Sequence, residues 1–208
     1  MNIKSLINSS FNSGFGFRFI KPKIFLIGFN KCGTTSLHFF FRDQGLKSAH
    51  WMLGKKFLAL EAERNRDLVN CRKLFSGYQV FSDFTFLTET EFKEPLDLYP
   101  IWREAFPNAY FILNDRPVDE WIDSRLNHRN GQFIERYKTY SGLSESEIVN
   151  QWRDKFLTHQ KNVMIFFRSD PKFCHFTLGR DHIMKITNLV KADYSLDANN
   201  FIRRNSRK

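Results

Sequence analysis

The sequence predicts an α/β fold, a three-layer sandwich in which a central, mostly parallel sheet carries a phosphate-binding loop after its first strand. Apolar segments rich in β-forming residues alternate with helical segments across short connections, which is typical of parallel sheets. Three of the expected strands end on polar or charged residues, and ligands of such folds bind at the carboxyl ends of the strands. Hydrophobic residues make up 42% of the 208 positions, enough for one substantial core.

A single domain is expected over residues 23–200, because no linker or internal repeat divides the chain. A polar lead-in (1–22) precedes it, and a basic tail (201–208) follows it. The lead-in lacks the apolar core and cleavage site of a signal peptide, and no apolar run reaches the ~20 residues of a membrane span. The three cysteines have no C-x-x-C spacing, which argues against a disulfide framework or zinc site. We therefore expect a cytoplasmic protein without a transmembrane segment.

The first half of the chain shows alternating apolar and helical patterns. Residues 23–28 form an apolar run that predicts a buried strand. Residues 34–45 carry apolar side chains at helical spacing and end on a glycine, which predicts a helix. A short strand at 47–50, a helix at 55–74 and a main strand at 78–83 are expected to follow.

A helix, a strand and a second helix are expected over the middle of the chain. Residues 95–106 have the spacing of a helix, and 109–115 form an apolar run that predicts a strand. Residues 116–126 should form a helix with Pro117 in its first turn, where a missing backbone N–H costs little. Acidic residues that follow Pro117 suit the positive end of the helix dipole.

The last third of the chain predicts two helices around one strand. Ser144 and Glu147 have the spacing of a capping box, which predicts the start of a helix over 145–161. A strand at 173–178 and a helix at 181–191 complete the expected elements.

The formal net charge of +10 favours an anionic ligand, such as a nucleotide, a nucleic acid or an acidic lipid surface. No nucleic-acid-binding motif stands out, so we expect no specific nucleic-acid partner. The basic residues are spread along the chain, and a dispersed solvated surface is the simpler explanation for any single one of them.

The segment Gly28-Phe-Asn-Lys31-Cys-Gly33-Thr-Thr-Ser36 has the layout of a phosphate-binding loop. A glycine turn follows the first strand, and hydroxyl residues begin the next helix, so backbone N–H groups converge on an anion. Loops that bind nucleoside triphosphates place a lysine directly after the second glycine. Here Thr34 has that place and the lysine is Lys31, so the loop suits a phosphate but lacks the lysine typical of a triphosphate site.

Two further charged residues end strands and are expected beside this loop. Asp83 ends the strand at 78–83, and Arg116 follows the strand at 109–115. Ser124 lies eight positions after Arg116, two helical turns on, where a hydroxyl can assist the guanidinium in binding a phosphate. A plain ion pair of Arg116 with Asp119 or Glu120 is the alternative.

Together these motifs resemble the P-loop sulfotransferases that use 3′-phosphoadenosine-5′-phosphosulfate (PAPS), most closely a compact bacterial-like branch, over residues 23–128. In that family a Lys-x-Gly-Thr-[Thr/Ser] loop holds the 5′-phosphosulfate, and an arginine with a serine eight positions later binds the 3′-phosphate. The usual proline before the loop lysine is Asn30 here, and the long basic loop near the C-terminus is reduced to a short basic tail. The resemblance implies this donor-binding set: Asn30, Lys31, Cys32, Gly33, Thr34, Thr35, Ser36, Arg116, Ser124, Arg203 and Arg204.

The resemblance also implies catalytic roles. Lys31 would offset the charge that develops on the leaving 3′,5′-bisphosphate (PAP), and Asp83 would act as general base toward the acceptor. His50 is the second candidate for the base, or a contact to the acceptor. The structural alternatives are a capping or Lys31-pairing role for Asp83 and a space-filling role for the Cys32 thiol.

The expected function is transfer of a sulfuryl group from PAPS to a hydroxyl of a carbohydrate or other small metabolite, without a metal. The acceptor would be bound by the segments 51–77, 84–95 and 129–160. A nucleotide kinase or NTPase with a degenerate loop is one alternative, and a non-catalytic basic module that binds anions is another. Magnesium dependence separates the first two.

Overall fold

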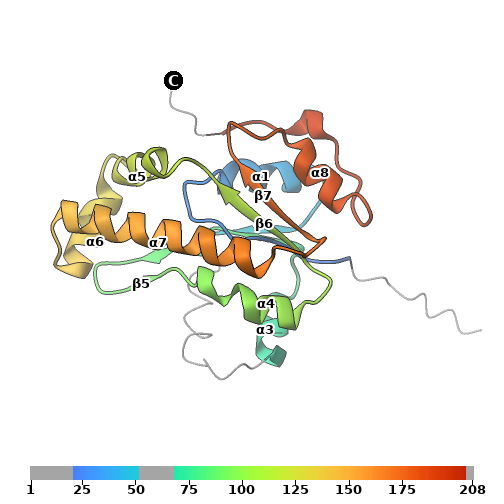
Figure 1. Ribbon diagram of the computed structural model, residues 1–208, viewed down its shortest axis with the longest axis horizontal. Helices are drawn as coiled ribbons and strands as arrows, with labels where there is room; N and C mark the ends of the chain where they lie inside the picture. The colour runs from blue at the N-terminus through green and yellow to red at the C-terminus, as the bar shows by residue number, and fades with distance from the viewer. Residues whose placement is uncertain (1–20, 52–67, 205–208) are drawn as a thin grey trace, which may run out of the picture.

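The computed structural model describes residues 21–51 and 68–204. Within these residues the main sheet has five strands, all parallel, in the order β2-β3-β1-β6-β7 (Figure 1). The parallel sheet predicted from the sequence is therefore confirmed. The strands in that order are Ser48–His50, Val80–Ser82, Ile24–Leu26, Tyr110–Asp115 and Phe173–Thr177.

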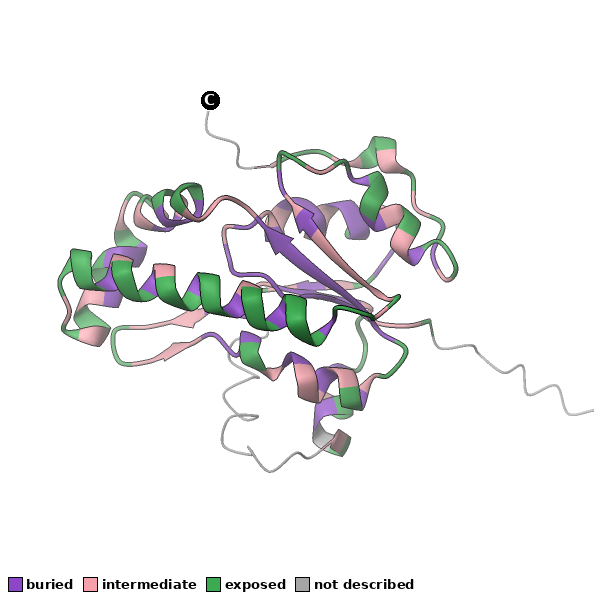
Figure 2. Cartoon of the chain, viewed as in Figure 1, coloured by how far each residue is buried: buried purple, intermediate pink, exposed green. Residues whose placement is uncertain are grey.

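Alternation along the strands divides the core into two clusters, one on each face of the sheet. Phe25 and Phe111 belong to one cluster, whereas Ile24 and Ile112 belong to the other. Helices cover both faces, so the molecule is the three-layer sandwich that the sequence predicts (Figures 1 and 2). The first face packs against α3 (Leu68–Leu74), α4 (Tyr99–Ala105) and α7 (Glu145–Phe166), and the second against α1 (Thr34–Arg42) and α8 (Met184–Val190).

The remaining elements lie around the carboxyl ends of the strands or connect the layers. They are α5 (Val118–Leu126), α6 (Gln132–Ser141), an antiparallel hairpin of β4 (Phe86–Leu87) and β5 (Phe92–Lys93), and the short 3₁₀ helices η1 (Leu96–Leu98) and η2 (Ala198–Asn200).

The ends of several helices differ from the sequence prediction. Helix α7 continues to Phe166 because no helix breaker follows residue 161 and Val163 is buried in the core. Helix α5 begins at Val118, since Pro117 has an extended ψ of 135° and serves as the N-cap. Of the helix expected at 55–74, only Leu68–Leu74 is described. Residues 55–67 of that helix, nearly all of the lead-in and 205–208 of the tail lie outside the described residues.

Helix α6 and the β4–β5 hairpin were not predicted. Helix α6 lies between Gly131 and Gly142, both with positive φ, and buries Phe133, Ile134 and Tyr137. Its spacing of apolar residues and its flanking glycines were usable signals for a helix. The hairpin has strands of only two residues, too short for any periodic pattern.

No helix in the described ranges combines the length and the apolar character that a membrane span requires. The longest, α7, is exposed along one side and buried along the other (Figure 2).

The close packing of β1 on β6 makes a first testable prediction. A Cβ at Gly28 would lie 1.8 Å from the main-chain oxygen of Asn114, so the backbone would have to move. We expect Gly28→Ala to lower the free energy of unfolding by about 3 kcal/mol or more, as overpacking in a rigid core does. Urea unfolding measures this loss.

Gly45→Ala is the matched control, because a Cβ there meets no atom within 4 Å and only its φ of 85° opposes the substitution. It should cost about 1–2 kcal/mol, the penalty for a left-handed residue. Equal losses at the two positions would contradict the packing argument.

Candidate active site

A cleft of about 690 Å³ lies at the carboxyl ends of β1, β2, β3 and β6. Every residue that the sequence predicts for the site lines it, except Cys32. The structure therefore brings together residues from distant parts of the chain, from the loop at 30–36 to Arg203 and Arg204 near the C-terminus. The expected residues that line the cleft are Asn30, Lys31, Gly33, Thr34, Thr35, Ser36, His50, Asp83, Arg116, Ser124, Arg203 and Arg204.

The backbone of the phosphate-binding loop is held by buried side chains from other elements. The backbone N–H of Gly28 donates to Oδ1 of Asn114 on β6 (2.9 Å), and Nδ2 of Asn114 donates to the carbonyl of Cys32 (3.1 Å). Nε1 of Trp121 on α5 donates to the carbonyl of Asn30 (2.9 Å). Because buried backbone groups need partners, these bonds determine the path of the loop.

A buried arginine below the loop orients Asn30. The Arg125 side chain is fully buried, its Nε donates to Oδ1 of Asn30 (3.0 Å), and its Nη2 forms an ion pair with Glu94. The rings of Trp121 and Trp152 each lie 4.7 Å from the guanidinium carbon. A buried charge is tolerated only when paired in this way. Sequence reasoning missed this network, because Glu94 is far from Arg125 in the chain and no spacing links them.

Cys32 does not line the cleft. Its side chain is completely buried, and burial raises the pKa of the thiol well above its usual range. A protonated thiol in the core has neither access to a ligand nor nucleophilic character. The side chain of Cys32 is therefore excluded from the cleft and fills space, as the alternative interpretation held.

Lys31 has a positive φ of 66° and directs its side chain toward His128. The distance between Lys31 Nζ and His128 Nδ1 is 3.2 Å. Burial, together with Lys31 and neighbouring arginines, lowers the pKa of His128 to about 4. His128 is therefore neutral at pH 7 and accepts a hydrogen bond from the ammonium group of Lys31.

Arg116 connects the end of β6 to the loop. Its Nη1 donates to the carbonyl of Lys31 (3.1 Å), and its Nη2 pairs with Glu120 (3.1 Å). Arg116 thus forms the ion pair with Glu120 that the alternative interpretation expected, and it also lines the cleft. Its role in binding a phosphate stays a prediction. Its buried Nε has no hydrogen-bond partner among the described residues.

The C-terminal segment packs onto α1 and reaches the cleft. The backbone N–H of Arg204 donates to the hydroxyl of Ser36 (2.9 Å), and the Arg204 guanidinium lies over the ring of Phe39 (4.1 Å). The Ser36 hydroxyl therefore holds this segment in place. Nε of Arg204 is buried without a hydrogen-bond partner among the described residues.

Asp83 and His50 face the same side of the cleft, with 4.0 Å between Asp83 Oδ2 and His50 Nε2. Burial raises the pKa of Asp83 to about 6, although a hydrogen bond from the backbone of Thr85 opposes the shift. Burial and the stacked ring of His38 lower the pKa of His50 to about 4. Both groups can accept a proton at neutral pH.

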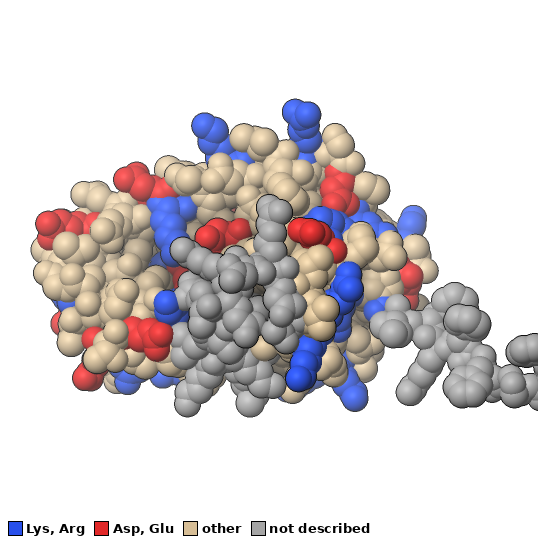
Figure 3. All heavy atoms as spheres, turned by 90° about the horizontal axis from the view of Figure 1, so that it is seen from below, with Lys and Arg blue, Asp and Glu red and all other residues tan. Residues whose placement is uncertain are grey.

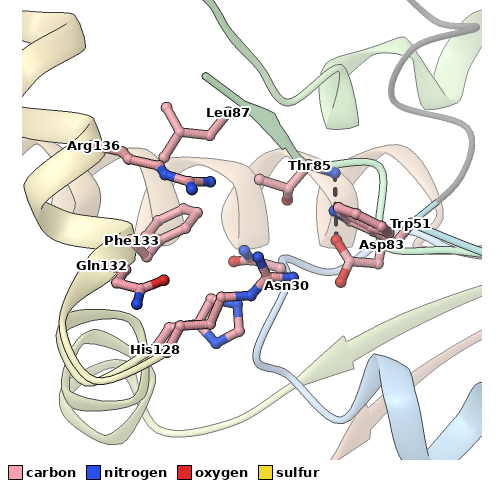
Figure 4. A pocket seen from close by; sticks show the side chains of 10 residues that line it. Asn30, Trp51, Asp83, Thr85, Leu87, His128, Gln132, Phe133 and Arg136 are labelled. Carbon is pink, nitrogen blue, oxygen red and sulfur yellow. Dashed lines mark hydrogen bonds between the residues drawn. The ribbon is translucent and has the colours of Figure 1, made fainter. Parts of the chain in front are cut away.

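A smaller cavity of about 70 Å³ adjoins the cleft beside Asp83 (Figure 4). Gln132, Phe133 and Arg136 project from α6 on one side of it, and Trp51 and Asp83 lie on the other. Asp83 lines both the cleft and the cavity, so it lies where the two spaces meet. The other residues common to both are Asn30, Trp51, His128 and Arg129.

Comparison with known proteins identifies the class to which this fold and cleft belong. The family model of the sulfotransferase domain matches residues 23–199, so the chain belongs to the sulfotransferase domain family. This membership supports an enzyme that transfers sulfate. The match extends well beyond residue 128 and includes α6, α7 and α8.

A solved sulfotransferase structure agrees with this fold. A sulfotransferase from Alicyclobacillus acidocaldarius is 16% identical over 86% of this chain and 85% of its own, with a TM-score of 0.50. A sugar kinase from Janibacter sp. HTCC2649 is 16% identical over 68% of this chain and 95% of its own, with a TM-score of only 0.36. No curated protein sequence matches the chain significantly.

The raised pKa of Asp83 predicts how stability depends on pH. Burial disfavours the ionised carboxylate in the folded protein. The free energy of unfolding is therefore highest while Asp83 is protonated, and it falls as pH rises toward and through 6. We expect Asp83→Asn to raise the free energy of unfolding by roughly 3 kcal/mol at pH 8 and by only about 0.5 kcal/mol at pH 4. Asparagine also tolerates the φ of 54° at this position.

Asp181→Asn is the control of opposite sign. A hydrogen bond from the backbone of Thr177 lowers the pKa of Asp181, so its ionised form stabilises the fold. This variant should be less stable than the wild type at pH 8, with the loss shrinking in acid. Urea unfolding at several pH values measures both variants, and a destabilised Asp83→Asn protein at pH 8 would refute the prediction.

Proposed function

We propose that this protein transfers a sulfuryl group from PAPS to a hydroxyl group of an acceptor. The observation that supports this proposal most strongly is the convergence of Lys31, Asp83 and Arg116 on one cleft from three different strand ends. A cation, a base with a pKa of about 6 and a second anion-binding arginine are the groups that this chemistry requires.

The cleft suits a donor that carries two separate phosphate groups. Gly33 caps α1 without any side-chain hydrogen bond, so the first-turn N–H groups are available to an anion. The guanidinium groups of Arg116 and Arg204 each have a buried Nε without a hydrogen-bond partner among the described residues. An anionic ligand could supply the missing acceptor. Arg116 with Ser124 is proposed to hold the 3′-phosphate, and the loop from Asn30 to Ser36 the 5′-phosphosulfate.

The catalytic groups have distinct proposed tasks. When bound, the donor would supply the activated sulfuryl group. Lys31 would stabilise the negative charge that remains on the 5′-phosphate after transfer, and His128 keeps its ammonium group oriented until then. Asp83 would take the proton of the acceptor hydroxyl, and His50 beside it is the alternative base. PAP would leave from the same cleft.

The acceptor remains a proposal drawn from the same site. We propose a carbohydrate or another small hydroxylated metabolite, bound from the side of the small cavity. We further propose a single catalytic domain over residues 23–200 that works in the cytoplasm without a metal.

Neither alternative function finds comparable support. A kinase or NTPase would need a lysine to reach the β- and γ-phosphates, and Thr34 occupies that place in the loop. A module that binds anions only through surface charge would favour a uniform basic face. On the face in Figure 3, basic and acidic side chains are interspersed.

Binding of the donor product tests the site directly. Isothermal titration with adenosine-3′,5′-bisphosphate in the absence of magnesium should show micromolar binding, with ATP much weaker. Arg116→Ala should weaken this binding about tenfold to a hundredfold, the worth of a charged hydrogen bond. Lys31→Ala should retain most of the binding but abolish transfer, because Lys31 acts mainly in the transition state.

Arg168→Ala is the matched control, since this exposed arginine lies in the turn between α7 and β7 and does not line the cleft. It should bind adenosine-3′,5′-bisphosphate like the wild type. If ATP binds only with magnesium and the bisphosphate does not bind, the result would contradict this proposal and favour the kinase or NTPase function.

The dependence of transfer on pH identifies the base. If Asp83 takes the proton, kcat/KM should rise tenfold per pH unit below about 6 and level off above it, because only the carboxylate accepts a proton. Asp83→Asn should then lose nearly all activity and still bind the bisphosphate. A profile that levels off near pH 4, with an active Asp83→Asn enzyme, would assign the base to His50 instead.

A further inference from the structure

The small cavity beside Asp83 has a chemical character that narrows the class of acceptor. We propose that the acceptor carries an anionic group, a carboxylate or a sulfate, which binds to Arg129 and Arg136 while the acceptor hydroxyl lies at Asp83. This inference rests on the proposed function. Both arginines line this cavity. Guanidinium groups bind planar or tetrahedral oxyanions through paired N–H donors.

Two glutamates close in sequence to lining residues of the cavity already have cationic partners. Glu94 pairs with Arg125 and Lys155, and Glu135 on α6 pairs with Lys138. Within the described ranges, neither Arg129 nor Arg136 forms an ion pair with any carboxylate. Among the described residues, Asp83 is the one carboxyl group that lines the cavity itself, and its raised pKa limits its negative charge near pH 6. The cavity therefore has a net positive lining.

The backbone that carries Arg129 is strained. Arg129 and Asn130 have φ values of 52° and 55°, and Gly131 follows at 84° before α6 begins. Left-handed conformations at non-glycine residues are costly and persist where the surrounding structure imposes them, often at ligand sites. This turn holds Arg129 near the ring of Trp51, with 5.8 Å between the guanidinium carbon and the ring centre.

The two arginines differ in which of the two spaces they line, so their effects on acceptor binding and donor binding can be distinguished. Arg129 lines both spaces, whereas Arg136 lines only the small cavity and not the donor cleft. Leu87, Phe133 and Trp51 give the cavity apolar walls that suit the carbon skeleton next to an anionic group (Figure 4). A volume of about 70 Å³ suits one small substituent, with the rest of the acceptor in the open cleft. A substitution of Arg136 should therefore change the binding of the acceptor and leave the binding of the donor unchanged.

The experiment compares anionic compounds with neutral twins on the enzyme loaded with adenosine-3′,5′-bisphosphate. The pairs are p-nitrophenyl glucuronide with p-nitrophenyl glucoside, 4-hydroxybenzoate with 4-hydroxybenzamide, and glucosamine N-sulfate with N-acetylglucosamine. Calorimetric binding is measured at millimolar ligand for the wild type, Arg136→Ala and Arg168→Ala. We expect at least one anionic member to bind roughly tenfold more tightly than its twin.

Arg136→Ala should abolish this preference and leave both the neutral twin and the bisphosphate bound as before. A merely structural role of Arg136 would weaken all three ligands. Arg168→Ala, which removes the same charge elsewhere, should keep the wild-type preference. The inference is overturned if no anionic member binds better than its twin, or if the preference survives in Arg136→Ala. Failure of the bisphosphate itself to bind would instead refute the proposed function.

Discussion

The cleft at the carboxyl ends of the strands depends above all on the hydrogen bonds that Asn114 makes to Gly28 and Cys32 in the loop at 28–36. Its side-chain oxygen accepts from Gly28, and its side-chain nitrogen donates to Cys32, so one buried amide spans the turn. Gly28 must be glycine for this contact, because β6 leaves no space for a Cβ. The loop thereby keeps its backbone N–H groups and the start of α1 directed toward the cleft, where an anion can use them.

The network beneath the loop extends this control into the rest of the molecule. Arg125 joins Asn30 of the loop to Glu94, and Glu94 also accepts from Thr85, two residues after Asp83. The loop and the segment that carries the proposed base are thus tied to the same buried ion pair. Removing one partner of such a pair leaves an uncompensated charge in the core, so the pair fixes the positions of both segments.

Burial also sets the protonation states in the cleft. It raises the pKa of Asp83 to about 6 and lowers those of His50 and His128 to about 4. At neutral pH the two imidazoles are therefore neutral, and the positive charge of the cleft comes from lysine and arginine side chains. Among the described residues, five such cations line the cleft together with three carboxyl groups, so this lining has a net positive charge.

The amino-acid sequence by itself determined the parallel α/β fold, the glycine-containing loop between β1 and α1, and the positions of Lys31, Asp83 and Arg116 at strand ends, because these follow from local patterns and from the geometry of parallel sheets. The sequence motifs also led to the family that the comparison confirms. Only the tertiary structure decided that Cys32 is buried, that Lys31 lies against His128, and that Arg125 supports the loop through Glu94. It also decided that α6 places Arg136 beside Asp83. These contacts join residues far apart in the chain, and burial, which sets their charges, depends on packing that no local spacing encodes.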